Sequence, residues 1–242
     1  MDRIKILREF VNSSDNIVFL GGAGVSTESN IPDFRSSNGI YSTESKYGYS
    51  PEVMLSHSFF VNHTEEFFDF YRNTMIYKDA KPNLAHTALA ELEDMGKLKA
   101  IVTQNIDGLH QLAGSKNVIE LHGSVYRNYC QDCRKFFDLD YVLNSKSMIP
   151  KCDQCGGIVK PDVVLYEEPL KSDDITMAME AITNCDMLIV GGTSLVVYPA
   201  ANLVRYYEGD KLVLINKDST NYDRYAKLVI NDSIGKTLNN IF

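Results

Sequence analysis

The chain has 242 residues, of which 44% are hydrophobic and 23% charged, and its formal net charge is −8. This length suits one large domain with a small insertion, and the composition is that of an ordinary globular protein. The acidic balance disfavours direct nucleic-acid binding, which draws on a basic face. No run of 18 apolar residues occurs, so we expect no membrane span.

The first eleven residues carry Ile4, Leu7 and Val11 at helical spacing and lack the layout of a signal peptide. An amphipathic helix is therefore expected at this end. Together with cysteines that are interpreted below as reduced thiols, this start predicts a cytoplasmic location.

Short apolar runs alternate with helical patterns along the chain. The runs predict buried strands at Ile17–Leu20, Lys99–Val102, Val118–Leu121, Met187–Val190, Leu212–Ile215 and Lys227–Ile230. The helical patterns are Glu65–Tyr77, His86–Met95, Asp174–Thr183 and Pro199–Tyr207. Strands that alternate with helices are typical of βαβ units, so the sequence predicts an α/β fold with a mostly parallel sheet.

The first predicted strand ends in the glycine-rich segment Gly21–Ser26. Such a turn between a strand and a helix lets backbone N–H groups approach a phosphate. The third glycine of the usual dinucleotide pattern is absent, because position 27 is Thr, and a simple tight turn explains the glycines nearly as well. The irregular stretch Asp33–Ser58 that follows is either a functional lid or a packed surface excursion.

Polar side chains follow the next two predicted strands, in the segments Thr103–His110 and Glu120–Gly123. Asn105 and Asp107 are suited to hold a ribose or a water, and His122 is suited to act as a base near neutral pH. Each residue also has a plain structural interpretation, as a turn or helix cap for the first two and as a buried histidine for His122. Their convergence at strand ends favours a site.

Four cysteines stand in two pairs, Cys130-x-x-Cys133 and Cys152-x-x-Cys155, with 18 residues between the pairs. This spacing predicts one four-thiolate zinc site, and a closed shell of that kind holds structure rather than performing catalysis. Two disulfides or four incidental thiols are the alternatives. The segment from Cys130 to Gly157 is polar and rich in turn formers, and the metal is its only evident core. Cys185 lies beside an apolar strand, where a packing role is expected.

A second strand, Met187–Val190, runs into Gly191-Gly192-Thr193-Ser194. Two glycine turns at strand ends would flank one crevice at the edge of a parallel sheet. Leu212–Ile215 ends in Asn216, which is placed either to meet an adenosine ribose or to form a turn.

In combination, these motifs resemble the sirtuins, a family of NAD-dependent protein-lysine deacylases. The resemblance covers residues 17–233 and rests on the order of five motifs and the four cysteines. The motifs are Gly22–Ser26, Pro32–Arg35, Thr103–His110, Leu121–Gly123 and Gly192–Leu195.

The resemblance implies a large Rossmann-like domain, with helices on both faces of its sheet, and a small domain that holds a zinc ribbon. The large domain would comprise residues 1–32, 87–125 and 159–242, and the small domain residues 33–86 and 126–158. The expected substrates are NAD and an acyl-lysine protein or peptide, and the expected products are deacylated lysine, nicotinamide and O-acyl-ADP-ribose. No membrane and no nucleic acid is expected as a partner, and a monomer is favoured.

The resemblance also assigns residues. His122 would be the catalytic base, with Asn105 and Asp107 as further catalytic residues, and the peptide would contact Val164 and Tyr166. The NAD contacts would be Ala23, Thr27, Phe34, Arg35, Gln104, Ile106, Asp107, His122, Thr193, Ser194, Asn216, Lys217 and Ser233. The metal ligands would be Cys130, Cys133, Cys152 and Cys155.

Two departures concern the substrate. Relatives that prefer succinyl-lysine or malonyl-lysine carry a Tyr and an Arg three residues apart, and our alignment places Tyr71 and Thr74 there, so an uncharged acyl group is expected. Glu167 stands where the family usually has Gly, next to the strand that pairs with the peptide, and this residue bears on peptide docking. The alternative functions are protein mono-ADP-ribosyl transfer from the same NAD site, a non-catalytic NAD or zinc-binding module, and hydride transfer.

Overall fold

The computed structural model describes residues 2–33 and 47–242. Its main element is a parallel sheet of six strands in the spatial order β3-β2-β1-β7-β8-β9. The strands are β1 (Ile17–Gly21), β2 (Leu98–Thr103), β3 (Val118–Glu120), β7 (Met187–Gly191), β8 (Leu212–Ile215) and β9 (Leu228–Ile230). They coincide with the six predicted apolar runs to within one residue at each end, and the α/β prediction is confirmed.

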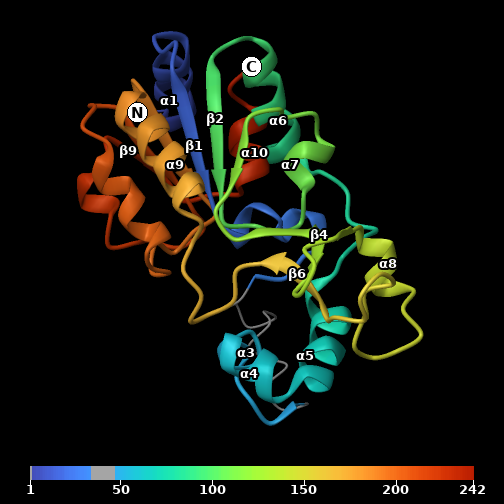
Figure 1. Cartoon of the computed structure of the whole chain (residues 1–242). Coiled ribbons are helices and arrows are strands. Elements are labelled where there is room, and N and C mark those ends of the chain that lie inside the picture. Colours follow the sequence, from blue (N-terminus) through green and yellow to red (C-terminus); the bar gives the residue numbers. More distant parts are fainter. Residues whose placement is uncertain (1, 34–46) are drawn as a thin grey trace.

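Helices cover both faces of the sheet (Figure 1), and each face is buried against them in an apolar layer. One layer comes from α1 (Arg3–Asn12), α6 (Leu84–Asp94) and α10 (Ile234–Asn239), and the other from α9 (Ser172–Asn184) and the 3-10 helix η5 (Ala200–Tyr206). Within β1, Ile17 and Phe19 face the first layer, and Val18 and Leu20 face the second. Both faces of the strand are therefore buried, which explains why its sequence is a continuous apolar run.

Capping side chains fix the N-terminal ends of two helices in the first layer. The Asp2 carboxylate accepts a hydrogen bond from the backbone N of Ile4 and caps α1. Asn83 and His86 form a reciprocal capping box at the start of α6. Leu7, on the inner face of α1, is fully buried, and burial of a leucine side chain contributes about 1.5–3 kcal/mol.

A second, antiparallel sheet with the order β5-β4-β6 forms a smaller unit. Its strands are β4 (Gly123–Cys130), β5 (Phe136–Phe137) and β6 (Val159–Val163). Its helices are α3 (Pro51–Met54), α4 (His57–Asn62), α5 (Thr64–Phe70), the π-helix η4 (Tyr71–Met75) and α8 (Leu139–Leu143).

This smaller unit has an apolar core of its own, which corrects the expectation that a metal is the only core of the cysteine-bearing segment. Phe137 and Val142 from that segment pack in one cluster with Phe67 and Tyr71. The aromatic residues lie on α5 and η4, far away in the sequence, so the segment alone did not reveal the core. The domain boundaries given above stay a prediction.

The remaining short elements are η1 (Ala23–Val25), η2 (Thr27–Ser29), α7 (Leu109–Leu112) and η6 (Asp223–Tyr225). Among the described residues, no helix is both long and apolar enough to cross a membrane.

Candidate active site

The strand order of the large sheet places a crevice between β1 and β7. Numbered along the chain, the six strands stand in the order 3-2-1-4-5-6, so successive connections turn in opposite directions from this point. Ligands of open α/β sheets bind at such a switch point, outside the carboxyl ends of the strands. A cavity of about 650 Å³ lies there, within the range of roughly 300–1,000 Å³ typical of ligand sites.

The two glycine-rich turns form one side of this cavity and pack tightly against each other. Gly22 N donates to Gly191 O at 3.2 Å, and Gly24 N donates to Gly192 O at 2.8 Å. A Cβ at Gly22 would lie 2.7 Å from the Cβ of Thr193, and one at Gly24 would lie 2.8 Å from the Cα of Gly192. The glycines are therefore required for the approach of the two turns, in addition to any approach of a phosphate.

His122 lies in the turn between β3 and β4 and lines the cavity. Its Nδ1 is 2.9 Å from the backbone oxygen of Gln104. A carbonyl oxygen only accepts hydrogen bonds, so Nδ1 carries the proton, and the neutral ring presents a lone pair at Nε2. Burial lowers the pKa of His122, although the hydrogen bond to Gln104 opposes the shift. The ring is therefore neutral at physiological pH and able to accept a proton.

Asn105, Asp107 and Ser26 form a chain of hydrogen bonds beside His122 in the cavity lining. Asn105 Nδ2 donates to Ser26 Oγ at 3.0 Å, and Ser26 Oγ donates to Asp107 Oδ2 at 2.6 Å. The other oxygen of Asp107 accepts from Leu109 N at 2.9 Å, at the start of α7, so the expected cap is present too. Burial raises the pKa of Asp107 and outweighs the two hydrogen bonds, which act to lower it.

The far end of the cavity is built from the residues that follow β7 and β8. Thr193 N donates to Asn216 Oδ1 at 2.9 Å, and Gln104 Nε2 lies 3.4 Å from Thr193 Oγ1. Asn216 Nδ2 is buried and has no partner among the described residues. A buried donor without an acceptor is costly, so this end fits a ligand that offers an oxygen or nitrogen.

The Sir2 family profile matches residues 22–199, which is more than half of the chain. The protein belongs to the Sir2 family.

Relatives and solved structures agree with this membership. A protein of Clostridium tetani named NAD-dependent protein deacetylase is 73% identical over 241 residues, covering 100% of this chain and 98% of its own length. One of Staphylococcus aureus with the same name is 43% identical over 231 residues, covering 96% and 94%. A Sir2 structure with deacetylated p53 peptide and 3′-O-acetyl ADP ribose matches with a TM-score of 0.90 and 40% identity, covering 99% and 97% of the two chains. Another, with p53 peptide and NAD⁺, has a TM-score of 0.87, 40% identity and coverage of 100% and 97%.

The four predicted metal ligands of this Sir2 protein come together in the smaller unit. Their sulfur atoms all lie within 4.8 Å of one another. The Sγ atoms of Cys130 and Cys155 are 3.4 Å apart, and those of Cys133 and Cys152 are 3.6 Å apart. Four thiolates at about 2.3 Å from one zinc ion lie about 3.8 Å apart in a tetrahedron. All are free thiols, and the arrangement fits a closed zinc shell, whereas Cys185 is buried in the core of the large sheet.

Five of the residues that the resemblance assigns to NAD line the cavity, namely Ala23, Thr27, Ile106, Ser194 and Lys217. Ser233 is not among the described lining residues. Its Oγ instead donates to Glu28 Oε1 at 2.8 Å and accepts from the backbone N of Lys236 as the cap of α10. Phe34 and Arg35 lie outside the described residues.

The two expected peptide contacts lie in the segment that follows β6, which forms part of the cavity wall. Val164 N donates to His122 O at 3.0 Å, which joins this wall directly to the histidine turn. Tyr166 exchanges backbone hydrogen bonds with the segment before α4, because its N donates to Leu55 O and its O accepts from His57 N. Val164 and Tyr166 both line the cavity.

Tyr71, which the alignment places at the acyl pocket, packs in the apolar core of the smaller unit. Its side chain is fully buried and stacks on Phe67 at 5.8 Å between ring centroids, and it is not among the described lining residues. Thr74, one turn later, does line the cavity. Of the described lining residues, Lys217 is the sole Lys or Arg, so an uncharged acyl group remains the expectation.

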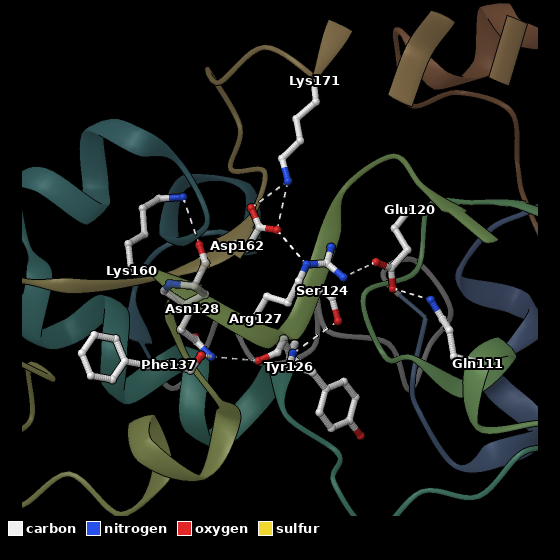
Figure 2. Close-up of polar contacts among 12 residues, drawn as sticks. Gln111, Glu120, Ser124, Tyr126, Arg127, Asn128, Phe137, Lys160, Asp162 and Lys171 are labelled. Atoms are coloured by element: carbon white, nitrogen blue, oxygen red, sulfur yellow. Dashed lines mark hydrogen bonds and ion pairs between the residues drawn. The ribbon is translucent and has the colours of Figure 1, made fainter. Parts of the chain in front are cut away.

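A charged network that the sequence did not reveal connects the residue before the histidine turn with the strands that follow it. Figure 2 shows the Arg127 guanidinium between two carboxylates, with its Nη1 2.6 Å from Glu120 Oε2 and its Nε 3.0 Å from Asp162 Oδ2. Gln111 Nε2 donates to the other oxygen of Glu120, and Lys171 pairs with Asp162 (Figure 2). Glu120 is the last residue of β3 and lies two positions before His122. Because Arg127 belongs to β4 and Asp162 to β6, the network ties the large sheet to the small sheet.

Arg127 comes from a bulge in β4, where residues 125–127 have no partner on β6 in the register. The same bulge places Val125 and Tyr126 in the cavity lining. Bulges re-aim side chains beside active sites, but no local pattern in the sequence marks this one.

Proposed function

We propose that this protein is an NAD-dependent protein-lysine deacetylase, which converts an acyl-lysine protein and NAD into deacylated lysine, nicotinamide and O-acyl-ADP-ribose. The observation that carries the proposal is the hydrogen bond from His122 Nδ1 to Gln104 O, which leaves Nε2 as the basic nitrogen of a histidine that lines the cavity at the switch point of the sheet. The relatives reported above, which are named NAD-dependent protein deacetylases, support it.

The site fits NAD, since the cavity has the volume and Asn216 Nδ2 lacks an acceptor. When bound, NAD supplies the ribose carbon that receives the acyl oxygen and the nicotinamide that leaves. We assign its adenosine end to Thr193, Ser194, Asn216 and Lys217, and its phosphates to the turn that contains Ala23 and Thr27. Ser233, Phe34 and Arg35 stay expectations from the resemblance.

The catalytic assignments follow from the hydrogen bonds. Nε2 of His122 accepts a proton from a ribose hydroxyl, and the Gln104 carbonyl stabilises the imidazolium that forms. Asn105 and Asp107, fixed by Ser26, position the polar groups of the nicotinamide end, where Ile106 supplies an apolar wall. Because the neutral ring is required and burial lowers its pKa, turnover should fall only as the pH drops through a value below 6.5.

We also propose that the protein acts on its substrates as a monomer in the cytoplasm, where its five free thiols stay reduced. ADP-ribosyl transfer to protein gains no support of its own from the geometry. Zinc lies outside the reaction, because four thiolates leave no open coordination position.

The test combines purified protein, an acetyl-lysine peptide and NAD, followed by mass spectrometry. We expect NAD-dependent loss of the acetyl group from the peptide together with equal amounts of nicotinamide and O-acetyl-ADP-ribose. Absence of peptide turnover, or a gain of ADP-ribose mass on a protein acceptor instead, would contradict the proposal.

A further inference from the structure

Glu167 occupies a turn position that ordinarily favours glycine. Glu168 N donates to Leu165 O at 3.0 Å, which closes a four-residue turn. The third residue of that turn, Glu167, has φ of 75°, as in a type II turn, whose third position requires a positive φ and is usually Gly or Asn. A residue with a Cβ and a long side chain is strained there, so the local backbone does not explain the choice of glutamate.

The Glu167 side chain is held in one place by a residue of another segment. Its Oε2 accepts hydrogen bonds from the backbone N of Ser58 at 2.9 Å and from Ser58 Oγ at 2.6 Å. These hydrogen bonds, with a smaller effect from nearby His57, lower the pKa of the carboxyl, so it is ionised at neutral pH. The charge therefore stands at a fixed position instead of moving freely in solvent.

This charge is exposed, and the nearby His57, which also acts to lower the pKa of Glu167, is paired with Glu168 instead. The neighbouring Glu168 is paired with Lys160 Nζ at 3.2 Å and with His57 Nδ1 at 2.9 Å. Glu167 makes no ion pair with a described Lys, Arg or His, and it is exposed. An exposed charge that is fixed in place and has no ion-pair partner among the described residues is available to a partner from outside the chain.

The position of the turn decides which partner meets this charge. Glu167 lines the same cavity as His122 and lies three residues beyond Val164, whose N bonds to His122 O. A lysine side chain that brings its acyl group to this histidine leaves its own backbone at the rim of the cavity. The residues next to the acyl-lysine then pass the turn that carries Glu167.

We propose that Glu167 determines sequence specificity by selecting acyl-lysines that have an arginine or lysine beside them. The inference rests on the proposed deacylase function and names the substrate class of the same site. It accounts for a glutamate where glycine would relieve the backbone.

The test uses three acetyl-lysine peptides that differ only in the residues flanking the acetyl-lysine, which are Arg, Ala or Glu. For the unmodified protein at low salt we expect kcat/KM to be roughly tenfold higher for the Arg peptide than for the Glu peptide, as for a few exposed charge pairs. High salt should shrink this ratio, because exposed charges are screened.

Two variants separate charge from backbone. Glu167→Gln keeps an oxygen for Ser58 and removes the charge, and Glu167→Gly removes both and relaxes the turn. Each should reduce the Arg-to-Glu ratio to about twofold, with kcat for the Ala peptide nearly unchanged, and the glycine variant should unfold at an equal or higher temperature. Glu9→Gln is the matched control, because it removes one exposed acidic charge from α1, outside the cavity lining, and should keep the full ratio.

Binding of the same peptides is measured by fluorescence anisotropy, so the inference is tested even without turnover. Charge-selective binding that depends on Glu167, without turnover of any peptide, would contradict the deacylase function and support the role of Glu167. Turnover or binding with the same Arg-to-Glu ratio in Glu167→Gln as in the unmodified protein would overturn the role of Glu167 alone. Neither binding nor turnover of any peptide would contradict both.

Discussion

The large parallel sheet and the small antiparallel sheet are stabilised in different ways. The six-stranded sheet has an apolar core on each face, whereas the three-stranded sheet shares a single core with α5 and η4 and holds four clustered thiols. The proposed catalytic groups stand at strand ends of the large sheet or in the turn that leaves it. The small unit contributes part of the cavity lining, a site that fits zinc and the Arg127 network, so its proposed role is to position rather than to react.

Removal of the metal should produce the largest difference in stability between the two regions. A structural zinc site supplies on the order of 10 kcal/mol of folding free energy. In Cys130→Ser, or in a strong chelator, we expect hydrogen exchange to become fast in β4 and β6 while β1 and β7 stay protected.

Cys185→Ser is the matched control for this change. Its Sγ donates to Ile182 O at 3.2 Å in the core of the large sheet, and a serine hydroxyl can make the same bond. Exchange in β4 and β6 should stay slow in this variant. A Cys130→Ser protein with slow exchange throughout would show that zinc is not needed to hold the small sheet.

Loss of the Arg127 network should loosen the junction between the regions. Arg127→Ala leaves Glu120, which is 9% exposed, without its guanidinium. We expect the free energy of unfolding to fall by about 2 kcal/mol, less than the roughly 3–5 kcal/mol of a fully buried pair, because Arg127 itself is partly exposed. We also expect kcat to fall more than KM rises, because the network braces the turn that holds His122.

Lys135→Ala tests whether any ion pair of the small unit has this effect. Its exposed pair with Asp153 lies in the zinc-bearing segment, and its loss should leave stability and kcat nearly unchanged. If both variants behaved alike, Arg127 would not be a positioning residue. Arg127→Lys, which restores the charge without the two-sided fork, should recover part of kcat.

Two buried histidines should make the large region sensitive to acid. Burial lowers the pKa of His110 to about 3 and that of His86 to about 4, and the two rings contact each other at 4.8 Å between centroids. Below about pH 6.5 the unfolded chain binds protons that the folded chain does not, so stability falls as pH falls from 6.5 toward 4. Each histidine contributes up to about 1.4 kcal/mol per pH unit to this slope.

Denaturant unfolding of His110→Leu between pH 7 and pH 4 checks this. The variant should show a flatter dependence of stability on pH, whereas His63→Gln, which changes an exposed histidine, should not. An unchanged slope in His110→Leu would mean that His110 is protonated in the folded protein.

The sequence predicted the large sheet well because strands buried on both faces are marked by apolar runs, as at β1 and β7. It also predicted that Asn105, Asp107 and His122 converge, since the carboxyl ends of parallel strands share one edge. Three features escaped it because no local pattern in the sequence marks them. These are the aromatic core that Phe67 brings to the cysteine segment, the bulge that aims Arg127 at Glu120, and the positive φ of Glu167.

The most direct test of the proposal that the chemistry belongs to the large sheet is a comparison of NAD binding and peptide turnover in His122→Ala. The alanine removes the Nε2 base and leaves the glycine turns and the zinc-bearing unit in place. We expect NAD to bind with nearly unchanged affinity while turnover of an acetyl-lysine peptide falls by roughly 10²–10⁴, the usual contribution of a general base. Full turnover in a folded, NAD-binding His122→Ala protein would contradict the account.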